Sequence, residues 1–261
     1  MILQVKDLSV SYWSREGYVD ALRHASFTVF EGEILGVVGE TGSGKSTIAY
    51  SVLNLLPFDS ERAGEIFFKN ENILSQPEKQ MQKIRGSQIG LVAQEPASMF
   101  NPVLSIKYQF QEVLKEKGKI KNKSQGLDII LDSFKKVKLP EPMRILRSYP
   151  HQLSGGQLQR VALAIAISLK PTLLIADEPT SALDVTIESQ IVNLLKELKE
   201  SLNLTVLFIT HNLDLVKVLC DRVVVLYQGR IKEVRSKDEL FSAPQDDYTK
   251  NLLKAFHDLG D

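Results

Sequence analysis

The stretch that decides the fold is Gly39-Glu40-Thr41-Gly42-Ser43-Gly44-Lys45-Ser46, which has the pattern G-x-x-x-x-G-K-S. An apolar run at residues 34–38 comes just before it and predicts a strand, and residues 47–53 are typical of a helix. Strand, glycine-rich turn and helix in this order form a phosphate-binding loop. A glycine-rich turn without a ligand is the alternative, and this context disfavours it. We therefore expect a nucleotide site here.

Each residue type in this loop has a physical role. Glycines let the backbone bend around phosphate oxygens with its N–H groups pointing inward, and the N-terminus of the following helix adds partial positive charge. Lys45 would reach the β- and γ-phosphates, and the Ser46 hydroxyl would ligate Mg²⁺. The loop thus predicts a bound nucleotide together with a magnesium ion.

The composition is that of an ordinary globular protein. The chain has 261 residues, of which 43% are hydrophobic and 25% charged, so it is long enough for a substantial core. Lys and Arg number 32, as do Asp and Glu. The resulting net charge of zero gives no support to electrostatic attraction of the whole protein to nucleic acid or anionic lipid.

The cysteine content and the lengths of the apolar runs indicate where in the cell the chain is expected. The single cysteine, Cys220, excludes an intramolecular disulfide and a cysteine-based metal cluster, and suits a reducing cytoplasm. Its apolar neighbours predict a packed thiol. No apolar run approaches the ~18 residues that a membrane span needs, and the N-terminus lacks a signal-peptide pattern. We expect a chain that is soluble by itself, with any membrane role supplied by a partner.

The first hundred residues contain several strand-like segments. Alternating apolar and polar residues predict an edge strand at 2–12, and a polar segment with Gly17 predicts a turn or loop over 13–20. Further strands are expected at 25–30, 64–68 and 88–93.

The middle of the chain, residues 95–152, has a different character, with five prolines and amphipathic helical patterns. Apolar residues fall at helical spacing over 106–114 and again over 127–134. The basic run 115–123 between them is expected to be a solvated loop between helices, with contact to an anionic partner as the alternative. We interpret this middle as a helical subdomain inserted into an α/β domain.

An α/β pattern then returns. Residues 158–170 are apolar on nearly all sides, which predicts a buried helix, and 172–176 and 205–209 are short apolar runs typical of buried parallel strands. Between these runs, 187–198 predict an amphipathic helix, and 223–227 and 231–234 flank a hairpin turn. Strands that alternate with helices indicate a mostly parallel sheet with antiparallel strands at one side.

Two acidic residues, Asp177 and Glu178, directly follow the strand expected at 172–176. A carboxylate at a strand end can hold Mg²⁺ through bound water against the β- and γ-phosphates. Hydrolysis also needs a group that polarises the attacking water, and Glu178 is the adjacent candidate. Solvated charges at the end of a strand are the alternative, which a phosphate loop in the same α/β pattern disfavours.

A second glycine-containing turn, Leu153-Ser154-Gly155-Gly156-Gln157, precedes the apolar helix. A hydroxyl, two glycines and a helix N-terminus make a second anion site, and Ser154 is also a suitable N-cap; the two roles are compatible. Because this turn has no lysine, we expect it to serve a phosphate held by another molecule.

These motifs together resemble the ATPase subunits of ABC transporters. Residues 39–46 resemble that family's Walker A motif, Gln94 its Q-loop and 153–157 its signature. Residues 173–178 resemble its Walker B motif, Ser181-Ala182-Leu183-Asp184 its D-loop and His211 its H-loop. The resemblance covers essentially the whole chain. It implies an α/β P-loop NTPase fold: a RecA-like core with a β-subdomain (1–94 and 158–235), an inserted helical subdomain with the signature (95–157) and a C-terminal helical tail (236–261).

The resemblance also implies roles at the matching positions. By this resemblance, Lys45 binds the β- and γ-phosphates, and Ser46, Gln94 and Asp177 hold Mg²⁺. Gln94 also senses the transporter. Glu178 is the catalytic base, and His211 contacts the γ-phosphate and fixes the attacking water. The ATP contacts are expected from Tyr12 and from Gly39, Glu40, Thr41, Gly42, Ser43, Gly44, Lys45, Ser46 and Thr47, and in trans from Ser154, Gly155, Gly156, Gln157 and Asp184. Tyr12 matches the aromatic residue that stacks on adenine, with Trp13 and Tyr18 as rivals.

Three stretches resemble the oligopeptide, dipeptide and nickel importer branch: 94–102, 149–154 and the tail 239–253. The expected partners are a second ATPase subunit, membrane permeases that the family docks at 94–102 and, indirectly, a solute-binding protein, with the chain at the cytoplasmic face of the membrane. Many relatives carry a C-terminal cysteine-bearing segment, sometimes with an iron–sulfur cluster; with Cys220 alone, we expect no such cluster.

Two other classes of protein share some of these motifs. An ABC ATPase that acts on nucleic acid or the ribosome is the main alternative, but such relatives usually carry two nucleotide domains or a long insertion, and the chain has no charge excess. A P-loop kinase or GTPase would leave 153–157 without a purpose. We therefore expect an ATPase that energises an importer.

Overall fold

The computed structural model describes residues 1–122, 125–181 and 183–258. Its contacts divide the chain into two compact units. The first unit is formed by Met1–Met81 together with Thr205–Asp261, and the second by Gln82–Leu204.

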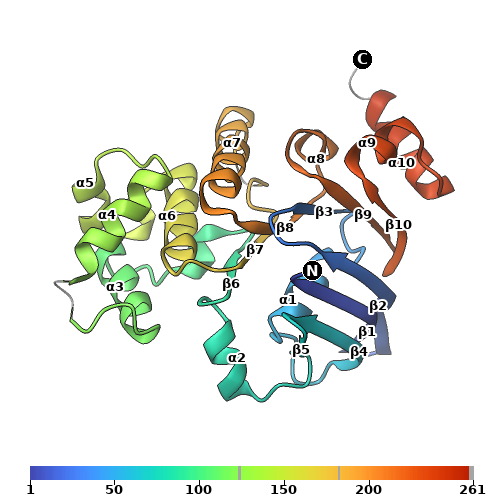
Figure 1. Cartoon of the computed structure of the whole chain (residues 1–261), viewed down its shortest axis with the longest axis horizontal. Helices are drawn as coiled ribbons and strands as arrows, with labels where there is room; N and C mark the ends of the chain where they lie inside the picture. The colour runs from blue at the N-terminus through green and yellow to red at the C-terminus, as the bar shows by residue number, and fades with distance from the viewer. Residues whose placement is uncertain (123–124, 182, 259–261) are drawn as a thin grey trace. The chain divides into compact units, whose positions relative to one another are not determined.

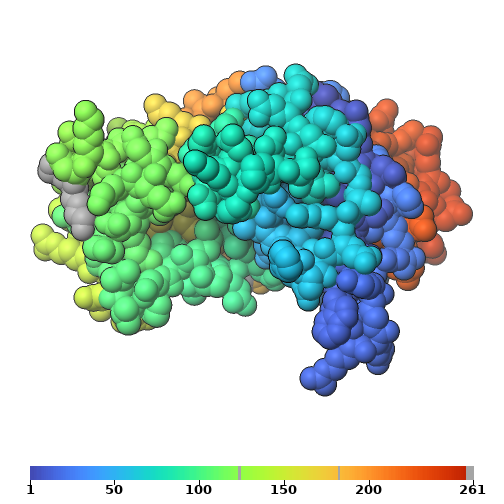
Figure 2. All heavy atoms as spheres, turned by 90° about the horizontal axis from the view of Figure 1, so that it is seen from below, coloured from blue at the N-terminus to red at the C-terminus, as the bar shows by residue number. Residues whose placement is uncertain are grey.

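The first unit contains an antiparallel sheet in the strand order β2-β1-β4-β5. Its strands are β1 (Leu3–Ser14), β2 (Gly17–Val29), β4 (Glu61–Phe68) and β5 (Glu71–Asn72). The turn or loop predicted over 13–20 is confined to a turn at Arg15-Glu16, because β1 and β2 pair almost to the end of their hairpin: Trp13 lies opposite Tyr18 and Ser14 opposite Gly17. Figure 2 shows the end of this hairpin as a dark-blue projection. The sequence did not predict these strand residues, because a two-stranded ribbon that is exposed on both faces lacks the alternation of apolar and polar residues that indicates a strand.

The same unit contains four strands in the order β10-β9-β3-β8. They are β3 (Ile34–Val38), β8 (Thr205–Thr210), β9 (Arg222–Tyr227) and β10 (Arg230–Ser236). β3 runs parallel to β8 and β9, and β10 closes this group antiparallel to β9. All residues of β3 and β8 are buried, as the apolar runs predict. The predicted hairpin turn is confirmed at Gln228-Gly229, where both residues have positive φ, 45° and 76°.

The helices of the first unit are α1 (Lys45–Val52), α8 (Leu213–Leu219), α9 (Lys237–Ser242) and α10 (Asp247–Asp258). The last two follow β10 and lie beside it, in red in Figure 1. Cys220, at the end of α8, is buried, which confirms the predicted packed thiol. Its Sγ lies 2.8 Å from where a Cβ on Gly36 would stand, so α8 packs closely on β3. The short helix α2 (Glu78–Ile84) crosses the division between the units in the chain.

The second unit combines two parallel strands, β6 (Ile89–Val92) and β7 (Leu173–Asp177), with most of the helices. They are η1 (Pro96–Met99), α3 (Ile106–Glu116), α4 (Gly126–Lys136), α5 (Pro142–Arg147), η3 (Pro150–Gln152), α6 (Gly155–Ser168) and α7 (Val185–Leu202). Figure 1 shows α3, α4 and α5 gathered beside α6. A tilted contact between Phe110 of α3 and Phe134 of α4, 5.9 Å between ring centroids, forms part of this helical core.

The predicted fold class, an α/β protein with parallel and antiparallel sheets and a helical insertion, is confirmed. The helix predicted from 158 begins earlier, at Gly155, because Ser154 and Gln157 cap it reciprocally. Of the basic run at 115–123, α3 takes the first two residues, and Lys123 lies outside the described residues.

Candidate nucleotide site

The phosphate loop joins β3 to α1, as predicted. The first residue of α1 is Lys45, and its N-cap is Gly44, which has a φ of 104° that favours glycine. Gly44 has no side chain to cap the helix, and the first turn of α1 carries no acidic residue. The N–H groups at this helix start are therefore suited to an anion.

Two polar side chains inside the loop are buried. The Lys45 ammonium donates hydrogen bonds to the backbone carbonyls of Gly39 and Glu40, both at 2.9 Å, and Lys45 is only 5% exposed. The Ser43 hydroxyl is buried and has no hydrogen-bond partner among the described residues. Buried polar groups without partners are uncommon in folded proteins, and here the orphan lies in the loop expected to bind phosphate. The loop therefore fits a polyphosphate.

The loop is braced by the end of β9. The Leu226 carbonyl oxygen lies 2.0 Å from where a Cβ on Gly39 would stand, so no larger residue fits there. Within the hairpin turn that follows β9, the Gly229 N–H donates to the Ser43 carbonyl at 3.0 Å. These contacts fix the loop to the sheet.

Two other predicted residues lie near this loop. Val38 of β3 is in register with Thr210 of β8, so the residues that follow, Gly39 and His211, leave the sheet at the same edge. Tyr12 donates from its hydroxyl to the Thr47 Oγ1, 3.2 Å away, in the first turn of α1. Its rivals Trp13 and Tyr18 are 58% and 50% exposed. Tyr12 is thus placed beside the loop, and its stacking on adenine stays a prediction.

The second unit brings two further candidates together. Val92 of β6 is in register with Ala176 of β7, which places Gln94 opposite Glu178 two residues beyond. The Gln94 amide donates to a Glu178 carboxylate oxygen at 3.1 Å. Neighbouring Asp177 is 3% exposed at the end of β7, whereas Glu178 is half-buried and has a positive φ of 44°. The backbone thus turns sharply where the catalytic base is expected.

The signature turn is a capped helix start. The Ser154 hydroxyl accepts a hydrogen bond from the Gln157 N–H at 3.3 Å, and the Gln157 side chain accepts one from the Ser154 N–H at 3.2 Å. The predicted N-cap is therefore confirmed. A Cβ on Gly156 would stand 2.7 Å from the Ile187 side chain on α7, and one on Gly155 3.3 Å from Leu183. Gly156 is therefore also needed for packing, which the local sequence did not indicate.

Asp184 has a structural role as well. Its carboxylate accepts a hydrogen bond from the Ile187 N–H at 2.9 Å and so caps α7. The D-loop prediction includes Ala182, which lies outside the described residues. Contacts of Asp184 and of the signature to a second subunit stay predictions.

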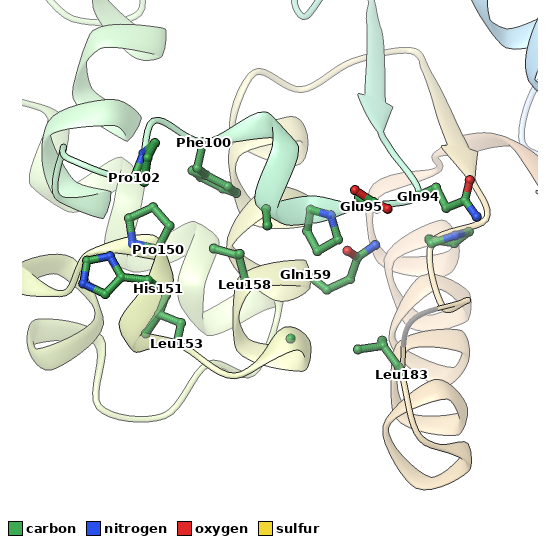
Figure 3. A pocket seen from close by; sticks show the side chains of 14 residues that line it. Gln94, Glu95, Phe100, Pro102, Pro150, His151, Leu153, Leu158, Gln159 and Leu183 are labelled. Carbon is green, nitrogen blue, oxygen red and sulfur yellow. The ribbon is translucent and has the colours of Figure 1, made fainter.

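A mainly apolar pocket of about 510 Å³ lies next to Gln94 in the second unit. Figure 3 shows Phe100, Pro150, His151 and Leu158 around it, with Leu183 facing them from the segment just before α7. The remaining lining residues are Gln94, Glu95, Pro96, Ala97, Pro102, Leu153, Gly155, Gln159 and Pro179. We call this hollow the Q-loop pocket.

One lining residue of the Q-loop pocket was missed by sequence reasoning. Gln159 is 1% exposed, and neither atom of its amide has a hydrogen-bond partner among the described residues. Its place in an otherwise apolar helix gave the only sequence signal, a polar residue at a core position. An unpaired amide in a pocket wall indicates that a group from outside the described residues forms hydrogen bonds with it.

Comparison with known proteins agrees with these observations. The model of the family described as ABC transporter matches residues 22–181. The oligopeptide transport ATP-binding protein OppD of Bacillus subtilis (strain 168) is 40% identical over 97% of this chain and 71% of its own length. The dipeptide transport ATP-binding protein DppD of the same organism is also 40% identical, over 97% of this chain and 76% of its own.

A similar solved structure is a dimeric ATP-binding cassette in a post-hydrolysis state, bound to ADP and phosphate. It is 28% identical, covers 90% of this chain and 99% of its own, and has a TM-score of 0.80. In the part of the present chain that the structure describes, no helix has the length and apolar character that crossing a bilayer requires.

Proposed function

The chain belongs to the ABC transporter family as an ATP-binding and ATP-hydrolysing subunit, and from this premise we propose that it energises the import of di- or oligopeptides, or of nickel, from the cytoplasmic face of the membrane. The observation that carries the proposal is the braced phosphate loop, with the Lys45 ammonium and the unpaired Ser43 hydroxyl inside it. Relatives named for oligopeptide and dipeptide transport support the solute class.

We propose the following division of roles on one ATP molecule. Lys45 and the N–H groups of 39–47 hold the phosphates, because an ammonium and oriented amides bind polyphosphate strongly. Tyr12 stacks on adenine. Glu178 takes a proton from water, whose oxygen forms a bond to the γ-phosphorus while the bond to the ADP oxygen breaks. His211 orients that water.

The oxygen donors of Ser46, Gln94 and Asp177 suit Mg²⁺, which prefers hard oxygen ligands. When bound, the ion neutralises charge on the phosphates. Gln94 donates to Glu178 in this structure, so a shift of the Gln94 segment reaches the proposed base directly. This contact is a physical route from a docked partner to the chemistry.

We further propose that a permease segment docks in the Q-loop pocket. Its apolar lining suits a hydrophobic side chain, and the unpaired amide of Gln159 suits a polar group of the docked segment. A solute-binding protein would act on the permease from the other side. The solute specificity then resides in those partners, and this chain supplies the energy of ATP hydrolysis.

A charge placed in this pocket is expected to release the permease. Ala97 is exposed and lines the pocket, so Ala97→Glu should fold normally and yet bury a carboxylate at the docked surface. We expect tagged wild-type chain, purified in detergent from native membranes, to retain polytopic permease subunits in stoichiometric amount. The amount of permease that copurifies with the variant should be at least about 10-fold lower.

The matched control is Ala255→Glu, an equal change at an exposed residue of α10, which should retain the permease. Equal retention by both variants would contradict docking in the Q-loop pocket. Wild-type chain that recovers no polytopic membrane protein would contradict the importer role itself.

A further inference from the structure

The C-terminal helix α10 contacts the phosphate loop directly. The Tyr248 hydroxyl donates a hydrogen bond to the carboxylate of Glu40 at 3.2 Å, although the two residues are 208 positions apart. Glu40 is the second residue of the loop, and its backbone carbonyl is one of the two that hold the Lys45 ammonium. Both ends of the contact lie in the first unit. The tail thus touches the residue that sets the position of Lys45.

The Tyr248 ring is itself fixed in place. It stacks on the ring of Tyr227 with 4.0 Å between centroids and 26° between planes. Tyr227 is the last residue of β9, next to the Leu226 carbonyl that closely approaches Gly39. The stack therefore joins α10 to the same strand end that braces the phosphate loop.

The start of α10 is anchored by a buried carboxylate. Glu233 of β10 accepts hydrogen bonds from the N–H groups of Gln245 and Asp246, at 3.0 Å and 3.1 Å. Arg235 pairs with the same carboxylate at 3.5 Å. Because the turn before the helix is held at several points, Tyr248 is presented to Glu40 by a rigid support.

The hydroxyl is a donor throughout the physiological pH range. Burial raises the pKa of Tyr248 to about 12, and the neighbouring Glu40 carboxylate adds to this effect. A protonated phenol can donate to a carboxylate, and hydrogen bonds to a charged group are stronger than neutral ones.

We propose that Tyr248 is a positioning residue for ATP binding, which holds the Glu40 carboxylate and so couples the C-terminal helix to the phosphate loop. This rests on the proposed ATPase function. Without the hydroxyl, the carboxylate keeps its charge but loses this donor, and it then acts on the bound phosphates by like-charge repulsion. Glu40 as a whole is also less restrained, so its backbone carbonyl, which holds Lys45, can shift. Both effects weaken ATP binding.

Tyr248→Phe isolates the hydroxyl, because phenylalanine keeps the stack on Tyr227. We expect the Kd for a fluorescent ATP analogue to rise about 3- to 10-fold, because the hydroxyl acts on ATP only through Glu40 and only part of the free energy of its hydrogen bond reaches the Kd. The KM for ATP should rise by the same factor, with kcat unchanged. A loss of folding alone would lower the active fraction and kcat and leave KM unaltered.

Two further variants make the test specific. Lys250→Ala removes an exposed ion pair with Asp247 on the same helix and should leave the Kd unchanged. In a Glu40→Gln background, Tyr248→Phe should have at most a twofold effect, because the carboxylate it restrains is gone. An unchanged Kd in Tyr248→Phe, or the same increase in both backgrounds, would overturn the proposal. Wild-type ATP binding with failed permease recovery would contradict the importer role and leave this coupling standing.

Discussion

Glu178→Gln is expected to bind ATP normally and to lose turnover by at least about 100-fold, the lower end of what general-base catalysis contributes. Glutamine keeps the size of the side chain and can still contact Gln94, which donates to Glu178 at 3.1 Å. It cannot accept the proton of the attacking water. ATP that is bound but not hydrolysed should therefore hold two subunits together, and size-exclusion chromatography with ATP should show a stable dimer.

The control for this variant is Glu200→Gln, the same change at an exposed position of α7 in the same unit. It should keep the wild-type rate, which separates loss of the base from loss of a negative charge. Normal ATPase activity in Glu178→Gln would contradict the assigned base.

Lys45→Ala is expected to raise the Kd for ATP by about 30-fold or more, because breaking a desolvated charge pair costs about 2–5 kcal/mol. In the structure the ammonium is buried and held by the Gly39 and Glu40 carbonyls, so the loop itself fixes its direction. ATP should raise the unfolding temperature of the wild type and leave that of the variant nearly unchanged.

Lys254→Ala, at an exposed position of α10, is the matched control and should bind ATP like the wild type. A Kd for Lys45→Ala within threefold of the wild-type value, in protein with a wild-type circular dichroism spectrum, would contradict the proposed phosphate site.

The phosphate loop could be predicted because all its signals are local. A fully apolar strand, a glycine-rich turn and a helix follow one another in the chain, and β3 and α1 lie where this order placed them. The parallel strands β7 and β8 were equally clear, since strands buried on both faces show unbroken apolar runs.

Features that depend on distant residues could not be predicted. The Gln94–Glu178 bond follows from the register of β6 with β7, which neither segment encodes alone. Likewise, Gly156 looked like part of an anion site, whereas its close approach to Ile187 appears only once α6 and α7 pack. The contact of Tyr248 with Glu40 joins residues that are 208 positions apart in the sequence. Strand pairing and packing decide all three.

We propose that Ser154–Gln157 of one subunit completes the ATP site of another. We would mix Lys45→Ala with Ser154→Asp, each inactive alone, and isolate mixed dimers with two different tags. Aspartate can still cap α6 but places a carboxylate at the expected phosphate. The account predicts about half of the wild-type ATPase rate per mixed dimer, because one of its two sites keeps both an intact loop and an intact signature. No activity in confirmed mixed dimers would contradict it.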